Sequence, residues 1–124
     1  MDTALWIVQV LIALAFVGAG IIHVTQRGRG TGFFAWMSAV PKPALTMIGV
    51  LEIAGAAGLV LPPATGIALW LTPLAAALLA LVVVFAAVFH LRRVGEGMNA
   101  VTNLVLAALA AFVAYGRLVL EPYV

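Results

Sequence analysis

The feature that most constrains this chain is its hydropathy: long apolar runs, each close to the length of a membrane-spanning helix, occupy almost all of it. A bilayer core about 30 Å thick is crossed by about 20 helical residues, and residues 4–23, 44–61, 64–90 and 98–120 form four such runs. Of the 124 residues 66% are hydrophobic and only 8% are charged, and a soluble domain of this size cannot bury that much apolar surface. The expected surroundings are therefore a lipid bilayer, in which spanning segments of this kind are helices.

The predicted fold is a single all-α domain, an integral membrane four-helix bundle. Pro62-Pro63 predicts a tight turn between the second and third helices, and Pro73 predicts either a kink in the third helix or its first turn. Residues 32–43, GFFAWMSAVPKP, are too few to span and suit a short helix lying at the membrane interface. Two interpretations of this aromatic segment remain open: a plain anchor, and a lid or partner-docking element.

Charge placement predicts the orientation. The first run starts with Met1-Asp2-Thr3, an acid where a signal peptide has basic residues, so we expect a retained helix. Five of the six Lys and Arg residues flank the first and third runs, which predicts cytoplasmic loops there and both termini outside, in a bacterial inner membrane; these five are Arg27, Arg29, Lys42, Arg92 and Arg93. They form no single patch, so nucleic acid is not an expected partner. Without cysteine, disulfides and thiolate metal sites are excluded.

One carboxylate interrupts the apolar run TMIGVLEIAGAAGLVLP, and a charge at mid-membrane costs about 2.5–3.5 kcal/mol on insertion scales. This residue, Glu52, shares a helix face with small residues, which predicts that it points into the bundle. The other runs also place polar residues on small-residue faces: Gln9, His23, His90, Asn99, Asn103 and Arg117. In the predicted orientation both histidines and both asparagines gather with Glu52 in the cytoplasmic half, where the histidines are expected to approach it.

These residues leave three interpretations open: interhelical hydrogen bonds alone, a polar cavity for a ligand head group or proton relay, and a metal site. Two histidines and a glutamate suit a divalent metal, but no i, i+4 ligand pair supports one, so no metal is predicted. Arg117 is expected to cap a cavity or to pair with Glu121. No nucleophile or phosphate motif and no haem, flavin or iron–sulfur motif is present. We therefore expect no cofactor, with a quinone as the alternative. The candidate ligand-binding residues are Glu52, His23, His90, Asn103, Gln9 and Arg117.

Two long segments of the chain form a familiar pattern: GVLEIAGAAGLVLPPATGIALWLTPLAAALLALVVVFAAVFHLRR and NLVLAALAAFVAYGR, with FVGAGIIH and PKP before them. In these segments the chain resembles the DoxX-like family of small four-helix membrane proteins. Matching positions are Glu52, Pro62, Pro73, His90, Arg92 and Gly116-Arg117, whereas His23 stands where other branches often have lysine. The resemblance implies a four-helix bundle in a bacterial cytoplasmic membrane. Some members of the wider family are named as subunits of quinone-linked or oxidant-defence complexes, and distant ones look like assembly factors.

The function expected from the sequence is a non-catalytic membrane protein that binds a small amphipathic ligand, a lipid or a partner subunit in the bundle interior. Glu52, His23, His90 and Asn103 would form the polar end of that site. The alternatives are a membrane subunit of a quinone-linked oxidoreductase complex, in which Glu52 and a histidine handle protons, and a structural bundle that forms homo-oligomers.

Overall fold

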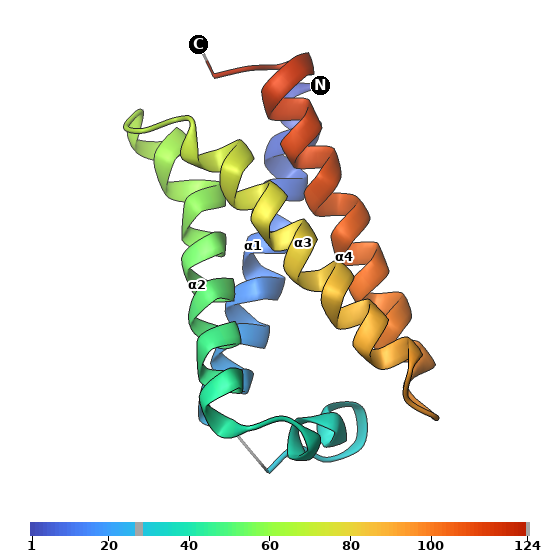
Figure 1. The fold of residues 1–124 in the computed structure, drawn as a ribbon. Coiled ribbons are helices and arrows are strands. Elements are labelled where there is room, and N and C mark those ends of the chain that lie inside the picture. Colours follow the sequence, from blue (N-terminus) through green and yellow to red (C-terminus); the bar gives the residue numbers. More distant parts are fainter. Residues whose placement is uncertain (27–28, 124) are drawn as a thin grey trace.

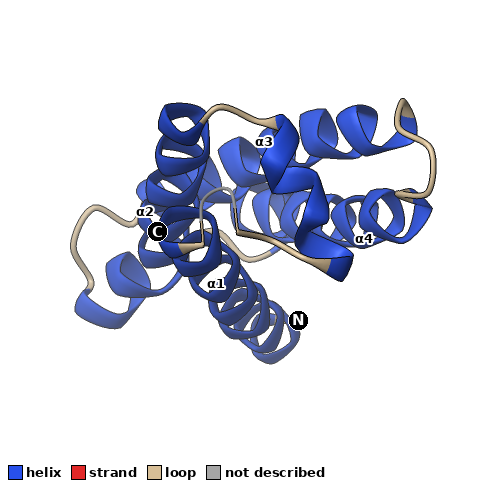
Figure 2. Ribbon diagram, turned by 90° about the horizontal axis from the view of Figure 1, so that it is seen from below, coloured by secondary structure: helices blue, strands red, loops and turns tan. Residues whose placement is uncertain are grey.

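Every regular element of this computed structural model, which describes residues 1–26 and 29–123, is a helix. The long helices are α1 (Asp2–Thr25), α2 (Lys42–Thr65), α3 (Leu71–Leu91) and α4 (Gly97–Tyr115), and the short ones are η1 (Gly32–Ala39) and η2 (Gly116–Leu120) (Figure 1). Figure 2 shows the same helices and the short loops that join them. The predicted all-α class and the short helix after the first long one are confirmed. Arg27, used above for orientation, lies outside the described residues.

Within the described residues, four helices are long and apolar enough to cross a membrane, with η2 extending α4 so that the last span runs from Gly97 to Leu120. Most of their large apolar side chains point outward: Leu14, Met47, Leu78 and Phe85 are all at least half exposed. Such a surface is stable only against hydrocarbon. The chain is therefore a membrane protein with four spans.

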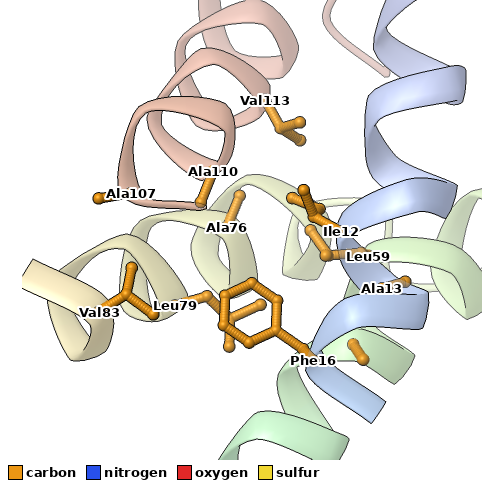
Figure 3. Packing of buried hydrophobic residues seen from close by; sticks show 11 residues of the cluster. Ile12, Ala13, Phe16, Leu59, Ala76, Leu79, Val83, Ala107, Ala110 and Val113 are labelled. Carbon is orange, nitrogen blue, oxygen red and sulfur yellow. The ribbon is translucent and has the colours of Figure 1, made fainter. Parts of the chain in front are cut away.

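The helices pack as two pairs, α1 along α2 and α3 along α4. The pairs meet near the α2–α3 turn and separate toward the other end, where η1 and the α3–α4 loop lie; we call this the η1 end (Figure 1). Both chain termini lie at the opposite end, the terminal end. Between the pairs, a core of apolar side chains surrounds the Phe16 ring, which lies beside Leu79 (Figure 3).

The turn between α2 and α3 lies later in the chain than predicted. α2 continues through Pro62 and Pro63 to Thr65 and ends at Gly66, which has the left-handed φ of 74° that favours glycine. α3 therefore begins at Leu71, so that Pro73 lies in its first turn, where a proline is tolerated. The expected turn at Pro62-Pro63 is thus wrong, and the expected first turn at Pro73 is correct.

Side chains from other helices explain why α2 does not stop at its prolines. A proline at position i has no N–H for the carbonyl of residue i−4, which here leaves the carbonyls of Gly58 and Leu59 without their helical donors. Thr72 Oγ1 donates to the Gly58 carbonyl at 2.9 Å, and Gln9 Nε2 donates to the Leu59 carbonyl at 2.7 Å. Tertiary hydrogen bonds thus replace the two missing helical ones.

We predict that Thr72→Val destabilises the bundle by about 1–3 kcal/mol, because it leaves the Gly58 carbonyl without a partner. The cost should shrink in a Pro62→Ala background, where residue 62 regains an N–H for that carbonyl. Unfolding in detergent, followed by circular dichroism, measures both values. Thr102→Val is the matched control, since its hydroxyl bonds only within α4 at an exposed position. Equal costs in both backgrounds would contradict the proline explanation.

Candidate functional site

The site predicted in the η1 half of the bundle is a cavity of about 550 Å³ between the two helical pairs. This volume is in the range of small-molecule sites, about 300–1,000 Å³. Four of the six candidate residues line it: His23, Glu52, His90 and Asn103. Its other walls are largely aromatic and aliphatic, from Phe33, Phe34, Trp36, Phe85, Phe89, Ile48 and Val82. The cavity is therefore mostly apolar, with a small polar group in it.

Glu52 is paired with His23 across the α1–α2 contact. Glu52 Oε1 and His23 Nδ1 lie 2.5 Å apart and share a buried hydrogen bond. Each residue lies one turn after a glycine, Gly49 in α2 and Gly20 in α1, and at these glycines the two backbones nearly touch. A Cβ built on Gly20 would lie 2.7 Å from the Gly49 carbonyl oxygen. The close crossing therefore brings the carboxyl and imidazole groups together.

His90 was expected to approach Glu52. It forms its hydrogen bond instead with Glu96, a residue that sequence reasoning missed. Its Nδ1 donates to Glu96 Oε1 at 2.8 Å, and Arg93 Nε donates to Glu96 Oε2 at 2.6 Å. The α3–α4 loop folds back at Gly95, whose φ of 82° favours glycine, and so returns Glu96 to the end of α3. The signal in the sequence was the short HLRRVGE segment, in which an acid follows the histidine across a glycine turn.

The Glu96 carboxyl lies outside the spans and titrates abnormally. Burial raises its pKa, but the hydrogen bonds and charges of Arg93 and His90 outweigh burial, so the pKa of Glu96 is below its usual value. With Nδ1 bonded to this carboxylate, Nε2 of the His90 ring is left without a partner among the described residues. Glu96 therefore positions the imidazole at the wall of the cavity.

Trp36 of η1 lies between the two histidines. Its ring centroid is 5.3 Å from that of His23 and 5.1 Å from that of His90, and both contacts are edge-to-face. η1 is attached to the bundle by Asn99, whose Nδ2 donates to the Phe33 carbonyl at 2.8 Å, and by the buried Met37. Side chains of the aromatic segment therefore form the cavity wall at the η1 end, a position that suits both the anchor and the lid interpretations. Asn103 lines the cavity, but its Nδ2 donates to the Asn99 carbonyl in its own helix.

Several polar atoms around the cavity remain available. Within the described ranges, Glu52 Oε2 and Nε2 of His23 and His90 have no hydrogen-bond partner in the protein. All three atoms keep some accessible surface. The one side-chain polar atom in the described residues that is both fully buried and unpartnered is Arg117 Nη2, which lies elsewhere in the bundle. An acceptor oxygen and two imidazole nitrogens can therefore meet a ligand. No group of three or more His, Cys, Asp or Glu residues in the described part of the chain is placed to hold a metal ion.

The other two candidates, Gln9 and Arg117, lie away from this cavity in a cluster at the terminal end. Arg117 Nε donates to Gln9 Oε1 at 2.7 Å, and Nη1 donates to Asp2 at 2.6 Å. The guanidinium also lies 4.2 Å from the centre of the Tyr123 ring. The expected side-chain pair with Glu121 is wrong: Arg117 reaches only the Glu121 backbone carbonyl, at 3.4 Å, and its carboxylate partner is Asp2. This cluster joins α1 to the α4–η2 span.

The fold and the site together define a small, four-span helical membrane protein with a polar-ended interior cavity. The chain belongs to the DoxX-like family, whose sequence profile matches residues 7–113. The matched range includes every residue that lines the cavity, whereas Asp2 and Arg117 of the terminal cluster lie outside it. No curated protein and no solved structure matches the chain.

We predict that Gly20→Ala destabilises the bundle by about 1–3 kcal/mol, because the new methyl group would overlap the Gly49 carbonyl and force α1 away from α2. Thermal unfolding in detergent measures the effect. Gly18→Ala is the matched control in the same helix, since a Cβ there meets nothing within 4 Å. If both variants unfold at the wild-type temperature, the crossing does not hold the pair together.

We also predict an acid-sensitive contribution to stability from Glu96. Because its pKa is lowered in the folded state, the stabilisation is complete above the usual glutamate pKa of about 4.3 and is lost as the pH falls through the lowered value. Glu96→Gln should therefore be less stable than wild type at neutral pH, with a difference that narrows in acid. Unfolding midpoints measured across that pH range test this, and a constant difference would contradict it.

Proposed function

We propose that this protein binds an uncharged amphipathic molecule from the bilayer, with a compact hydrogen-bonding head group in the cavity. The observation that carries the proposal is the set of unpartnered atoms at the cavity wall, Glu52 Oε2 and Nε2 of His23 and His90. A purely structural glutamate would be expected to have its hydrogen bonds completed by the protein, because an unsatisfied polar group is costly in hydrocarbon. A ligand donor that contacts Oε2 would complete them.

The charges around the cavity indicate an uncharged head group. Glu52 is a buried residue, 5% exposed, and its hydrogen-bond partner among the described residues is the His23 ring. An anionic head group beside it would face like-charge repulsion, and an isolated ion of either sign would lose its hydration in a mostly apolar cavity. A hydroxyl or carbonyl group avoids both costs and can bond to the carboxyl and imidazole groups.

The mouth of the cavity supports binding from the lipid phase. The lining residues at the α2–α3 gap, Ile48 and Phe85, are partly or largely exposed on the apolar surface that contacts lipid. Arg29, Lys42, Arg92 and Arg93 all belong to loops or helix ends at the η1 end. We therefore place the η1 end on the cytoplasmic side and both termini outside, in a bacterial inner membrane, by the positive-inside rule.

A quinone-linked role is a second candidate, favoured by the hydrogen-bonded Glu52–His23 pair beside aromatic cavity walls. A carboxyl and an imidazole that share a hydrogen bond can exchange a proton with a ring hydroxyl or carbonyl. In this role the protein would act as the membrane subunit of a complex, with electron transfer supplied by a partner. Quinol oxidation that depends on Glu52 in a reconstituted complex would separate this role from simple binding.

We predict that Glu52→Gln weakens binding of a para-alkylphenol about tenfold, since a hydrogen bond to a charged group is worth about 1.5–3 kcal/mol. Replacing Trp6 and Trp70 by Phe leaves Trp36 as the one tryptophan, at the cavity wall. A probe brominated on the chain carbon next to the ring then reports binding by quenching Trp36 fluorescence in detergent micelles.

The matched control is Glu121→Gln, whose side chain lies at the terminal end and does not line the cavity. Gel filtration confirms that each variant is folded and monodisperse. A Glu52→Leu variant that binds the probe as wild type does and unfolds at a higher temperature would show that the glutamate is not a binding group.

A further inference from the structure

A second hollow runs along the outer face of the bundle between α2 and α3. It has a volume of about 530 Å³ and, among the described helices, is lined only by apolar side chains and glycines. The middle of the α2 side is low because it carries small residues, Ala54, Ala57 and Gly58. The α3 side carries Leu74 and Leu78, which are about half exposed. We call this hollow the α2–α3 groove.

The groove adjoins the cavity. Val82 lines both, and Leu51 in the groove is the chain neighbour of Glu52 in the cavity. From Leu51 the groove follows α2 to Leu61 and Pro62, which is about 15 Å at the helical rise. A cavity with a polar end near the η1 end thus lies next to an apolar groove that runs toward the terminal end.

We propose that the α2–α3 groove holds the apolar tail of the ligand whose head lies in the cavity, so that the ligand is a lipid whose alkyl or isoprenoid chain lies along α2 and α3. This inference rests on the function proposed above. The described residues that line the groove offer no polar side chain with which a peptide or a soluble metabolite could bond, and the groove lies within the spans, where an alkyl or isoprenoid chain is the available occupant.

Groove binding in a bilayer depends on packing, because the tail leaves one apolar environment for another. The expected effect of blocking the groove is therefore modest and selective. Ala54→Phe fills the groove at an exposed position, away from the Gly55–Leu79 and Gly58–Ala75 contacts at which α2 and α3 touch. Ala111→Phe is the matched control, an exposed alanine of α4, which contributes no residue to the groove.

The test compares phenol with a long-chain para-alkylphenol on the protein that keeps Trp36 alone. Partition of the probe into micelles is the same for every variant, so ratios between variants report binding to the protein. We expect Ala54→Phe to weaken binding of the long-chain probe about fivefold and to leave phenol unchanged, while Ala111→Phe changes neither.

A second measurement does not depend on the stability of Ala54→Phe. In a protein whose only tryptophan is introduced by Leu78→Trp, a probe brominated at the far end of its chain should quench strongly, and one brominated next to the ring weakly. Trp36 should show the reverse order. If Ala54→Phe leaves both affinities unchanged and the two tryptophans show the same order, the tail does not lie in the groove. In that case loss of binding in Glu52→Gln would still support the cavity. If no probe quenches Trp36 in the otherwise wild-type chain, the proposed function fails and the tail path fails with it.

Discussion

In a membrane protein this small, each polar group inside the bundle must find its partner on another helix, because lipid offers none. That constraint accounts for most of the side-chain pairs described here. The carbonyls of Gly58 and Leu59, which lack helical donors because of the following prolines, accept hydrogen bonds from Thr72 and Gln9. Arg117 is held by Gln9 and Asp2. Glu52 meets His23 where α1 and α2 cross. Its second oxygen has no partner among the described residues, and the same holds for Nε2 of both histidines and for the buried Nη2 of Arg117.

The ends of the bundle solve this problem differently, and the difference defines the site. At the terminal end, Arg117, Gln9, Asp2 and Tyr123 form a closed cluster that ties α1 to the last span. At the η1 end the two helical pairs are apart, and the aromatic side chains of η1, Phe33, Phe34 and Trp36, lie in the space between them in place of helix–helix packing. These side chains do not fill the whole space between the pairs, so a cavity remains at this end.

Helical periodicity predicted the part of the structure in which residues are related by regular spacing along a span. The small-residue faces placed Glu52 and His23 inside the bundle, and four of the six candidate residues line the cavity. Periodicity says nothing about loops and chain ends, so Glu96 and Asp2, the partners of His90 and Arg117, were not predicted. The rule that proline ends a helix failed at Pro62-Pro63 because the side chains of Thr72 and Gln9 supply the hydrogen bonds that the prolines cannot donate. Both residues are distant from the prolines in sequence or lie on another helix, so helical spacing did not predict these bonds. Helical spacing correctly placed Gln9 and Arg117 on inward-facing sides of their helices. It did not predict that the two residues form a separate cluster at the terminal end.

The two helical pairs are joined at the α2–α3 turn and spread apart toward η1, so the joined end can act as a hinge. A small rotation of one pair about this end changes the distance between the pairs least near Leu59 and most near η1. His23 belongs to the α1–α2 pair and His90 to the α3–α4 pair, and the Trp36 ring makes edge-to-face contacts with both imidazoles. The distance between the two imidazole rings therefore reports how far apart the two helical pairs are at this end. The Trp36 indole between the rings limits how closely the pairs can approach each other.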